Sequence, residues 1–396
     1  MKTTLGVIAV AATLVALNAA AQPEGSEDEK NHYILCNFKC VEATPWVTTG
    51  KMNIARAGHT ATLLAGGRVL VVGGGNGSPD AIDSAELYDP PNRSWTLTGR
   101  LNVARFASTA TLLVDGRVLV TGGFSHGGFT NTAEVYDPAT GAWIRTGNMS
   151  TVRAGHSATL LQDGRVLVAG GQGPAGLGAL KTAEVFDPAT GAWSRTGDLN
   201  FPRMGHTATQ LLDGRVLVVR GQYGEDPWEG EGVNGDATSA ELYDPLAGTW
   251  TATAGSSAAN GSATLLPGGQ VLVVGGILDE FTPYPKTLTS SEVFDPDTGA
   301  WAQTMPLAAA HSSHTATLLP NGGVLIVGWT GTLNSAEQFD PNTTTWTTTS
   351  SLNTERAQHT ATLLADGSVL IAGGWAFGAD DMPILLDSCE LLGPRH

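Results

Sequence analysis

The chain has 396 residues, and its 37 Asp and Glu outnumber its 21 Lys and Arg, which gives a formal net charge of −16. A protein this acidic repels nucleic acid and anionic lipid unless a local basic patch overrides the field, and the sequence contains no basic run. Nucleic acid is therefore excluded as an expected partner, and a content of 51 Gly agrees with an exported all-β domain.

Residues 1–21 begin with one Lys and continue as a mostly apolar run of small residues that ends in Asn-Ala-Ala-Ala. This pattern is typical of a secretory signal peptide that is cut before Gln22. Residues 22–43 follow as a polar lead-in that contains Cys36 and Cys40. No later apolar run reaches about 18 residues. We therefore expect no membrane span and a secreted, extracellular or cell-envelope location.

A repeated pattern fills the rest of the chain. Residues 153–197 show it best, as RAGHSATLLQDGRVLVAGG, a variable insert, and KTAEVFDPATGAWSRTG. The copies lie 45 to 55 residues apart and number seven, anchored at His59, Ser108, His156, His206, Gly261, His314 and His359. A period near 50 residues indicates a supersecondary unit that must stack on neighbours to bury its apolar faces.

Each copy predicts four short antiparallel strands. In the third copy, Asp163-Gly164 lies between two alternating runs and is a hairpin signal. A third run, AEVFDP, ends at its Pro, and Ala-Thr-Gly then turns the chain into a fourth run that begins at Trp193.

Paired Gly after the second run, followed by Tyr or Phe and then Trp at fixed offsets, resemble the kelch repeat. The pairs stand at 73–74, 122–123, 170–171, 275–276 and 373–374, with departures at 220–221 and 328–329. The Trp series is Trp46, Trp95, Trp143, Trp193, Trp250, Trp301 and Trp346. The resemblance, to exported kelch proteins of the bacterial type and the galactose-oxidase-like propeller superfamily, implies a seven-bladed kelch β-propeller over residues 44–393.

The two ends of the repeat complement each other. Trp46 begins a fourth strand that lacks its own three partners, whereas the last copy ends at residues 391–394 without a Trp strand. We expect the N-terminal strand to complete the last blade, which closes the ring and removes two open sheet edges.

Three cysteines leave the disulfide pairing open. Cys389 belongs to the strand expected beside Trp46, opposite Thr48 or Thr49, and a bridge to Cys36 or Cys40 would lock the ring. Bridged Cα atoms must lie within about 7 Å, however, and this register leaves several residues between the partners. We therefore place a local Cys36–Cys40 disulfide ahead of a bridge to Cys389.

The inserts after the paired Gly vary in length, whereas the Asp-Gly turns are short and alike. All seven inserts belong on one face, together with the link from each Trp strand into the next blade. Ligand-binding residues concentrate on loops that a rigid scaffold presents. In the kelch proteins that the chain resembles, this loop face is the usual partner or substrate surface.

A ring of basic residues stands three positions before the His position of each copy, with Ala258 as the exception. These candidate ligand-binding residues are Arg56, Arg105, Arg153, Arg203, His311 and Arg356. As a cationic funnel they would suit carboxylates or sulfates. Alternatively, each Arg pairs with the Glu of the third strand, and the repetition favours this structural interpretation.

The five His that anchor the copies raise a metal hypothesis, because imidazole is a common transition-metal ligand. Equivalent atoms of neighbouring blades lie far apart, however, and no HxH or HxxxH pair supports a site. Hydrogen bonds between blades are the favoured interpretation, so we expect neither a metal site nor a cofactor.

Aromatic residues that break the repeat are the other candidate ligand-binding residues, because no structural role is repeated at their positions. They gather in blades four to seven, where we expect binding rather than at Phe124 or Phe129 of blade two, and they are Tyr223, Trp228, Tyr284, Trp329 and Trp375. Aromatics beside carboxylates resemble a sugar-binding surface. Packing of these aromatics on their own loops is the alternative, and the acidic cluster of blade four raises a Ca²⁺ hypothesis without matching an EF-hand.

These patterns favour a monomeric binding module for a protein or glycan ligand at the loop face. The alternative is a carbohydrate-active enzyme, an epimerase, lyase or oxidase, at the same face. Galactose oxidases use copper and a Tyr cross-linked to Cys, and no Cys is expected on the loop face here. We therefore expect no copper oxidase activity, and no motif singles out an acid–base set.

Overall fold

Short strands dominate the structure, because each repeat alternates apolar stretches with tight turns. The structure is a computed structural model. It describes residues 45–75, 81–174, 178–221, 239–256, 261–278, 286–329, 334–378, 380 and 382–394, without the side chains of residues 278, 286 and 329. The chain divides into two units, Met1–Ala43 and Thr44–His396. In the described ranges the regular elements are strands, and no helix has the length and apolarity needed to cross a bilayer.

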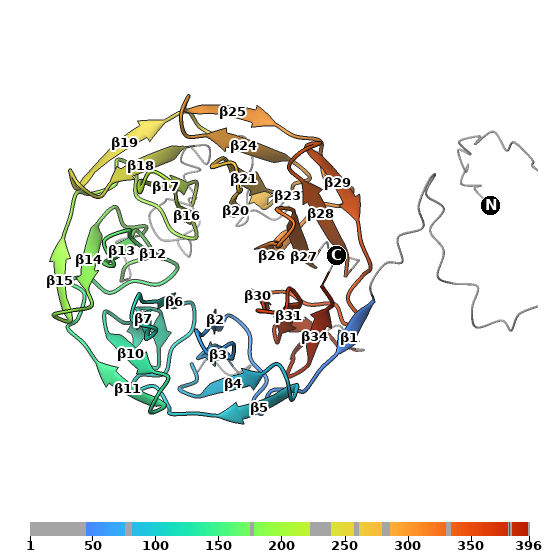
Figure 1. The fold of residues 1–396 in the computed structure, drawn as a ribbon. Coiled ribbons are helices and arrows are strands. Elements are labelled where there is room, and N and C mark those ends of the chain that lie inside the picture. Colours follow the sequence, from blue (N-terminus) through green and yellow to red (C-terminus); the bar gives the residue numbers. More distant parts are fainter. Residues whose placement is uncertain are drawn as a thin grey trace, which may run out of the picture. The chain divides into compact units, whose positions relative to one another are not determined.

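Seven four-stranded antiparallel sheets form the blades of a closed β-propeller (Figure 1). Blades one to three contain, from the inside outwards, β2 (Thr60–Leu63), β3 (Val69–Val72), β4 (Ala85–Asp89) and β5 (Ser94–Leu97); β6 (Thr109–Leu112), β7 (Val118–Thr121), β10 (Ala133–Asp137) and β11 (Ala142–Arg145); β12 (Ser157–Leu160), β13 (Val166–Ala169), β14 (Ala183–Asp187) and β15 (Ala192–Arg195).

Blades four to seven repeat this order, and the last blade takes its outer strand from the start of the ring. They contain β16 (Thr207–Gln210), β17 (Val216–Val219), β18 (Ala240–Asp244) and β19 (Thr249–Thr253); β20 (Ser262–Leu265), β21 (Val271–Val274), β24 (Ser291–Asp295) and β25 (Ala300–Gln303); β26 (Ser312–Leu318), β27 (Val324–Trp329), β28 (Ala336–Asp340) and β29 (Thr345–Thr348); β30 (Thr360–Leu363), β31 (Val369–Ala372), β34 (Cys389–Leu392) and β1 (Trp46–Thr48).

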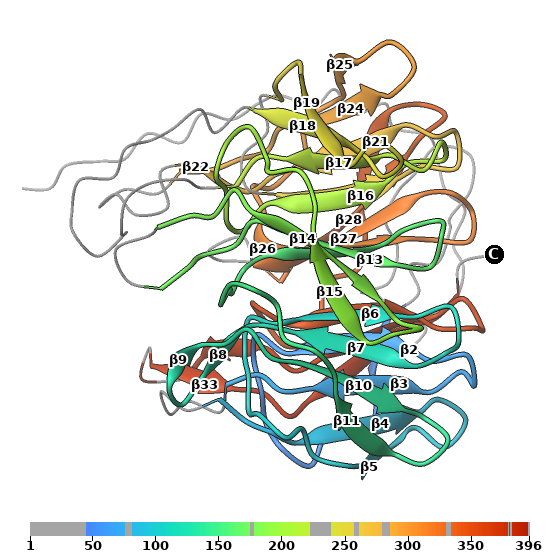
Figure 2. The ribbon, with the colours of Figure 1, turned by 90° about the vertical axis from the view of Figure 1, so that its left-hand side faces the viewer.

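In the described ranges, three further hairpins lie within the connections between the second and third strands of their blades. They are β8 (Phe124–Ser125) with β9 (Gly128–Phe129) in blade two, β22 (Ile277–Leu278) with β23 (Lys286–Thr287) in blade five, and β32 (Trp375–Phe377) with β33 (Pro383–Leu385) in blade seven. Figure 2 shows β8, β9, β22 and β33 on the same side of the ring. The turns between first and second strands lie at the other end of each blade, because the strands alternate in direction. The hairpins therefore mark the loop face.

The core lies between blades. The second strand of each blade is covered by a neighbouring blade on each side, so it is a continuous apolar run, such as Val69–Val72, and it is buried throughout. Leu70 and Val72 of blade one, for example, pack with Val118 and Val120 of blade two. Burial of apolar area between successive blades holds the ring together.

The Trp of each outer strand fastens its blade to the one before. Trp95 packs against Tyr88 of its own blade, with 5.0 Å between ring centroids, and its Nε1 donates a 2.9 Å hydrogen bond to the Gly50 carbonyl at the end of blade seven. Trp143 repeats this bond to the Gly99 carbonyl at 2.8 Å. These Trp residues of the sequence series therefore connect neighbouring blades through hydrogen bonds.

The ring closes as expected. Strand β1 pairs with β34 in antiparallel register, with Trp46 opposite Leu392 and Thr48 opposite Glu390. Trp46 Nε1 donates a 2.9 Å hydrogen bond to the Ser350 carbonyl of blade six, as Trp95 and Trp143 do to carbonyls at their junctions. The prediction that the N-terminal strand completes the last blade is confirmed.

Cys389 lies at the start of β34, where the Thr49 amide donates a 3.0 Å hydrogen bond to its carbonyl. The expected register is therefore confirmed. The thiol is free and buried, and burial raises its pKa to about 12. Cys36 and Cys40 lie outside the described residues, so the Cys36–Cys40 disulfide stays a prediction.

Candidate binding site

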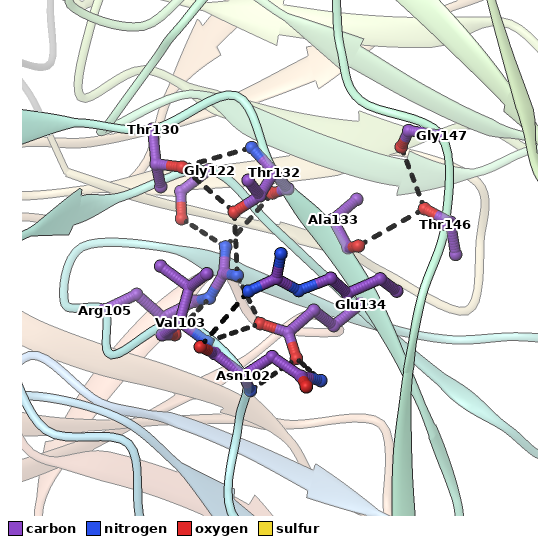
Figure 3. A network of polar contacts seen from close by, with 11 residues as sticks. Asn102, Val103, Arg105, Gly122, Thr130, Thr132, Ala133, Glu134, Thr146 and Gly147 are labelled. Carbon is purple, nitrogen blue, oxygen red and sulfur yellow. Dashed lines mark hydrogen bonds and ion pairs between the residues drawn. The ribbon is translucent and has the colours of Figure 1, made fainter.

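The ring arginines are buried, and blade two shows their contacts in full (Figure 3). Arg105 Nη1 donates to the Gly122 and Thr132 carbonyls at 2.8 and 3.1 Å, and its Nη2 lies 2.7 Å from Glu134 Oε1. Glu134 also accepts hydrogen bonds of 2.7 and 3.0 Å from the Asn102 and Val103 amides. One buried ion pair therefore ties the link from blade one to the third strand of blade two.

Four other blades repeat this arrangement, with guanidinium–carboxylate distances between 2.5 and 2.9 Å. The pairs are Arg56–Glu86, Arg153–Glu184, Arg203–Glu241 and Arg356–Glu390. All eight side chains are buried. The structural interpretation of the ring arginines is confirmed: they hold the blades, and their guanidinium groups do not line the loop face as a funnel.

Blade six replaces the guanidinium by an imidazole. His311 Nε2 lies 3.1 Å from Glu337 Oε1, and both side chains are buried. Burial acts to raise the pKa of Glu337, but hydrogen bonds from His311 and the Ala308 and Ala309 amides lower it below its ordinary value. His311, another predicted site residue, therefore has the same structural role as the arginines.

The five ring histidines connect neighbouring blades. Each Nε2 lies within 3.1 Å of a Ser or Thr hydroxyl on the inner strand of the preceding blade, in the pairs His59–Thr360, His156–Thr109, His206–Ser157, His314–Ser262 and His359–Thr315. Burial and the neighbouring Arg356 lower the pKa of His359 to about 3, so its imidazole is neutral at physiological pH. The favoured interpretation, hydrogen bonds between blades, is confirmed.

Of the five predicted aromatics, the structure describes one side chain. Trp375 begins β32 on the loop face. Tyr223, Trp228 and Tyr284 lie outside the described residues, and the side chain of Trp329 does as well. Ligand binding by these four residues stays a prediction.

Trp375 lines an apolar cavity of about 550 Å³ on the loop face at blades seven, one and two. Blade seven contributes Trp375 and Phe377, whose rings meet edge to face at 5.3 Å, and the side chains of Ile384 and Leu385. Phe106 of blade two forms part of the lining on the other side. A cavity of this size with aromatic and aliphatic walls is typical of a binding site.

The cavity exists because blade one has small residues where the neighbouring blades have aromatic ones. In three successive blades the residue after the ring Arg pairs, through two backbone hydrogen bonds, with the residue after the paired Gly. The paired residues are Ala357 and Trp375 in blade seven, Ala57 and Gly75 in blade one, and Phe106 and Phe124 in blade two. Two small residues therefore form a floor between aromatic neighbours.

The floor and the Phe106 wall are held rigidly. The Gly58 amide donates to the Gln358 carbonyl at 3.1 Å, and the Ala107 amide donates to the Gly58 carbonyl at 3.3 Å, so backbone bonds join the three blades beneath the cavity. Phe106 stacks on Phe124 with 5.1 Å between centroids. A preformed cavity of this kind spares a ligand part of the cost of ordering its site.

Sequence reasoning placed binding at blades four to seven, and the cavity shares only blade seven with that sector. Most inserts of blades four to six lie outside the described residues, so the expectation for them stays a prediction. Phe106 and Ile384 were not predicted. Phe106 had a visible signal, because it replaces the Ala of the Arg-Ala-Gly-His pattern in blade two.

Comparison with known proteins agrees with this architecture. A family model described as the KLHDC2/KLHL20/DRC7 Kelch-repeats domain matches residues 7–224, more than half of the chain. The chain belongs to the Kelch-repeat family. No curated protein matches this Kelch chain.

A solved structure similar to this Kelch propeller is a fungal alcohol oxidase of the AA5 family in complex with copper. The two share 20% sequence identity and a TM-score of 0.69, over 89% of this chain and 76% of the oxidase. At this identity the likeness shows the fold alone.

In the described part of the Kelch propeller, no three His, Cys, Asp or Glu side chains are grouped to hold a metal ion. The five histidines that anchor the repeats stand one to a blade, and their Nε2 atoms contact hydroxyls, whereas His311 contacts Glu337. The expectation that the protein lacks copper oxidase activity stays a prediction.

Proposed function

We propose that this protein is a monomeric binding module that holds its ligand in the cavity of blades seven, one and two. The cavity itself carries the proposal, because it combines aromatic walls, a preformed floor and a place on the loop face. Among the described residues, its lining contains the Gln358 amide and the Trp375 indole N–H as polar side-chain groups, and no carboxylate, imidazole or phenol. Such a lining suits binding better than acid–base catalysis, which needs a titratable group within reach of the substrate.

Removal of one cavity wall tests this function. The mature chain is screened on a glycan array and against a random-peptide phage library, beside Trp375→Ala and Trp228→Ala variants that keep the wild-type melting temperature. We expect Trp375→Ala to weaken binding by about 2 kcal/mol, some thirtyfold, because aromatic anchors dominate binding energy. Ligands that bind Trp375→Ala as tightly as wild type and lose affinity for Trp228→Ala would place the site in blade four instead.

We also propose that the module acts outside the cytoplasm. The support is the pattern of residues 1–21, a Lys followed by an apolar run and Ala-Ala-Ala, which is typical of a signal peptide. The expected mature protein begins at Gln22. Intact-mass measurement of the exported protein checks this, and an uncleaved chain retained in the cytoplasm would contradict it.

A further inference from the structure

The cavity lining offers little to the hydroxyl groups of a sugar. Stacking on Trp375 or Phe106 would cover one face of a pyranose, but each buried hydroxyl also needs a hydrogen-bonding partner. Among the described lining residues, the Gln358 amide and the Trp375 indole N–H are the polar side-chain groups. A buried donor or acceptor left without a partner is destabilising, because it loses its hydrogen bond to water. The lining therefore favours an apolar group over a carbohydrate.

The size and exposure of the walls fit side chains that project from a polypeptide. A volume of about 550 Å³ admits more than one large side chain. Phe377 and Ile384 each have 47% of their surface exposed at the edge, where they can contact the rest of an incoming chain. Large apolar anchors surrounded by such a rim are the usual centre of a protein interface.

Two carboxylates of blade seven lie close in sequence to residues that line the cavity or pair with them. Asp380 lies between β32 and β33, where its Oδ1 accepts a 3.2 Å hydrogen bond from the Met382 amide. Glu355 lies two residues before Ala357, the partner of Trp375. Within the described ranges, no Lys or Arg side chain forms an ion pair with either carboxylate. With a net charge of −16 behind them, they attract a cation.

From these observations we infer that the cavity takes an apolar side chain of a polypeptide segment that carries Lys or Arg beside it. The inference rests on the proposed function and specifies its ligand. The apolar anchor enters between Trp375 and Phe106 above Gly75, and the neighbouring basic residue lies toward Asp380. Affinity then comes from the anchor, whereas the charge pair contributes to orientation and to the association rate.

Blade one offers a clean way to fill the cavity. A Cβ added at Gly75 meets no heavy atom within 4 Å, and Gly75 is not among the residues with positive φ. Phe already occupies the equivalent position of blade two as Phe124, so Gly75→Phe fills the cavity without backbone strain. Gly66→Phe is the matched control, because a Cβ there is equally unobstructed but lies on the opposite face.

The experiment uses the full mature chain, selected against the random-peptide phage library and screened on the glycan array. We expect enrichment of peptides that place Trp, Phe or Leu beside Lys or Arg. A synthetic peptide of the best sequence should bind at least about tenfold more weakly to Gly75→Phe and about thirtyfold more weakly to Trp375→Ala, and normally to Gly66→Phe. The double variant Asp380→Asn, Glu355→Gln should weaken it severalfold at low salt, with little effect at about 1 M salt.

The possible failures differ from one another. Glycan binding that Gly75→Phe abolishes, without enriched peptides, overturns this inference and leaves the proposed function intact. No binding sensitive to Gly75→Phe or Trp375→Ala in either screen overturns both. Peptides that bind in the cavity but lack Lys and Arg, with affinities independent of salt and of Asp380 and Glu355, overturn the assignment of a basic ligand.

Discussion

At the scale of single residues, the buried ion pair is the chemical unit that the repeat preserves. Glu134 receives hydrogen bonds from Arg105 and from two backbone amides of the link that enters its blade. The carboxylate therefore accepts the hydrogen bonds that water would accept if these groups were not buried. Removing one partner leaves the other charge buried and uncompensated, which is the costly case for an ion pair.

Blade two allows a comparison of a buried and an exposed pair. Arg105→Leu should lower the free energy of unfolding by about 3–5 kcal/mol, because it leaves the buried Glu134 carboxylate without a counter-ion. Arg117→Ala removes an equally short ion pair with Asp115, but both partners are more than one third exposed, so we expect a loss below about 1 kcal/mol. Urea unfolding of the two variants measures both. Equal losses would show that burial does not decide the strength of these pairs.

At the scale of elements, the junction of blades four and five departs from the repeat in a coordinated way. A Cβ at Gly122 of blade two would lie 2.5 Å from the Arg153 carbonyl and 2.6 Å from His156 Cε1 of the next blade. Blade four has Arg220 at this position, with φ of 61°. Blade five lacks both the ring Arg and the ring His, which leaves room for the Arg220 side chain.

Arg220 brings a cation toward the acid of blade five. Its Nη2 donates a 2.6 Å hydrogen bond to the Ser256 carbonyl, and Ser256 Oγ donates one of 2.8 Å to Glu292. Arg220→Gly restores the repeat sequence, yet we expect it to destabilise the propeller. In a double-mutant cycle with Glu292→Gln the coupling should exceed about 0.5 kcal/mol, whereas Arg220→Gly and Glu134→Gln should be additive. Additive effects in both cycles would show that Arg220 and Glu292 are not energetically coupled.

The strands and their register follow from local signals, and the cavity does not. The Trp recurs in every blade, and Asp-Gly turns and runs similar to AEVFDP recur in most of them, so one repeat predicts the others and Trp46 predicts the closure. The Arg–Glu pairing was also open to prediction, because both residues recur together. The cavity depends on the absence of a side chain at Gly75, beside Trp375 and Phe106. These positions become neighbours only once the blades are assembled.

At the scale of the whole molecule, β1 makes the stability of the ring depend on its N-terminal strand. Deletion of residues 22–50 removes β1, exposes β34 and opens the junction that Trp46 holds. We expect this variant to melt at a lower temperature in a single transition, because the whole ring loosens. Deletion of residues 22–43 leaves β1 in place and serves as the control. A variant without β1 that melts at the wild-type temperature would contradict closure as a source of stability.

The histidines make the whole ring sensitive to acid. Burial is the main cause that lowers the pKa of His59, His206, His314 and His359 to about 3, whereas an unfolded His titrates near 6.5. The unfolded chain therefore binds more protons between these values, so stability is complete above about pH 6.5 and falls as the pH drops toward 3. Urea unfolding between pH 7 and 5 should show this slope. His359→Gln should make it shallower by up to about 1.4 kcal/mol per pH unit, and an unchanged slope would contradict the linkage.

The pairing of β1 with β34 also dictates an order of events during biosynthesis. The ribosome makes β1 before any other strand of the ring and its partner β34 after all of them. Until the last blade exists, β1 has no sheet to join, and the growing chain is an open arc with two unpaired edges. Closing this longest loop is the step with the greatest entropic cost. A chain arrested before β34 therefore exposes unpaired strand edges to chaperones and proteases. This difference gives a cell a simple means to distinguish finished rings from unfinished ones.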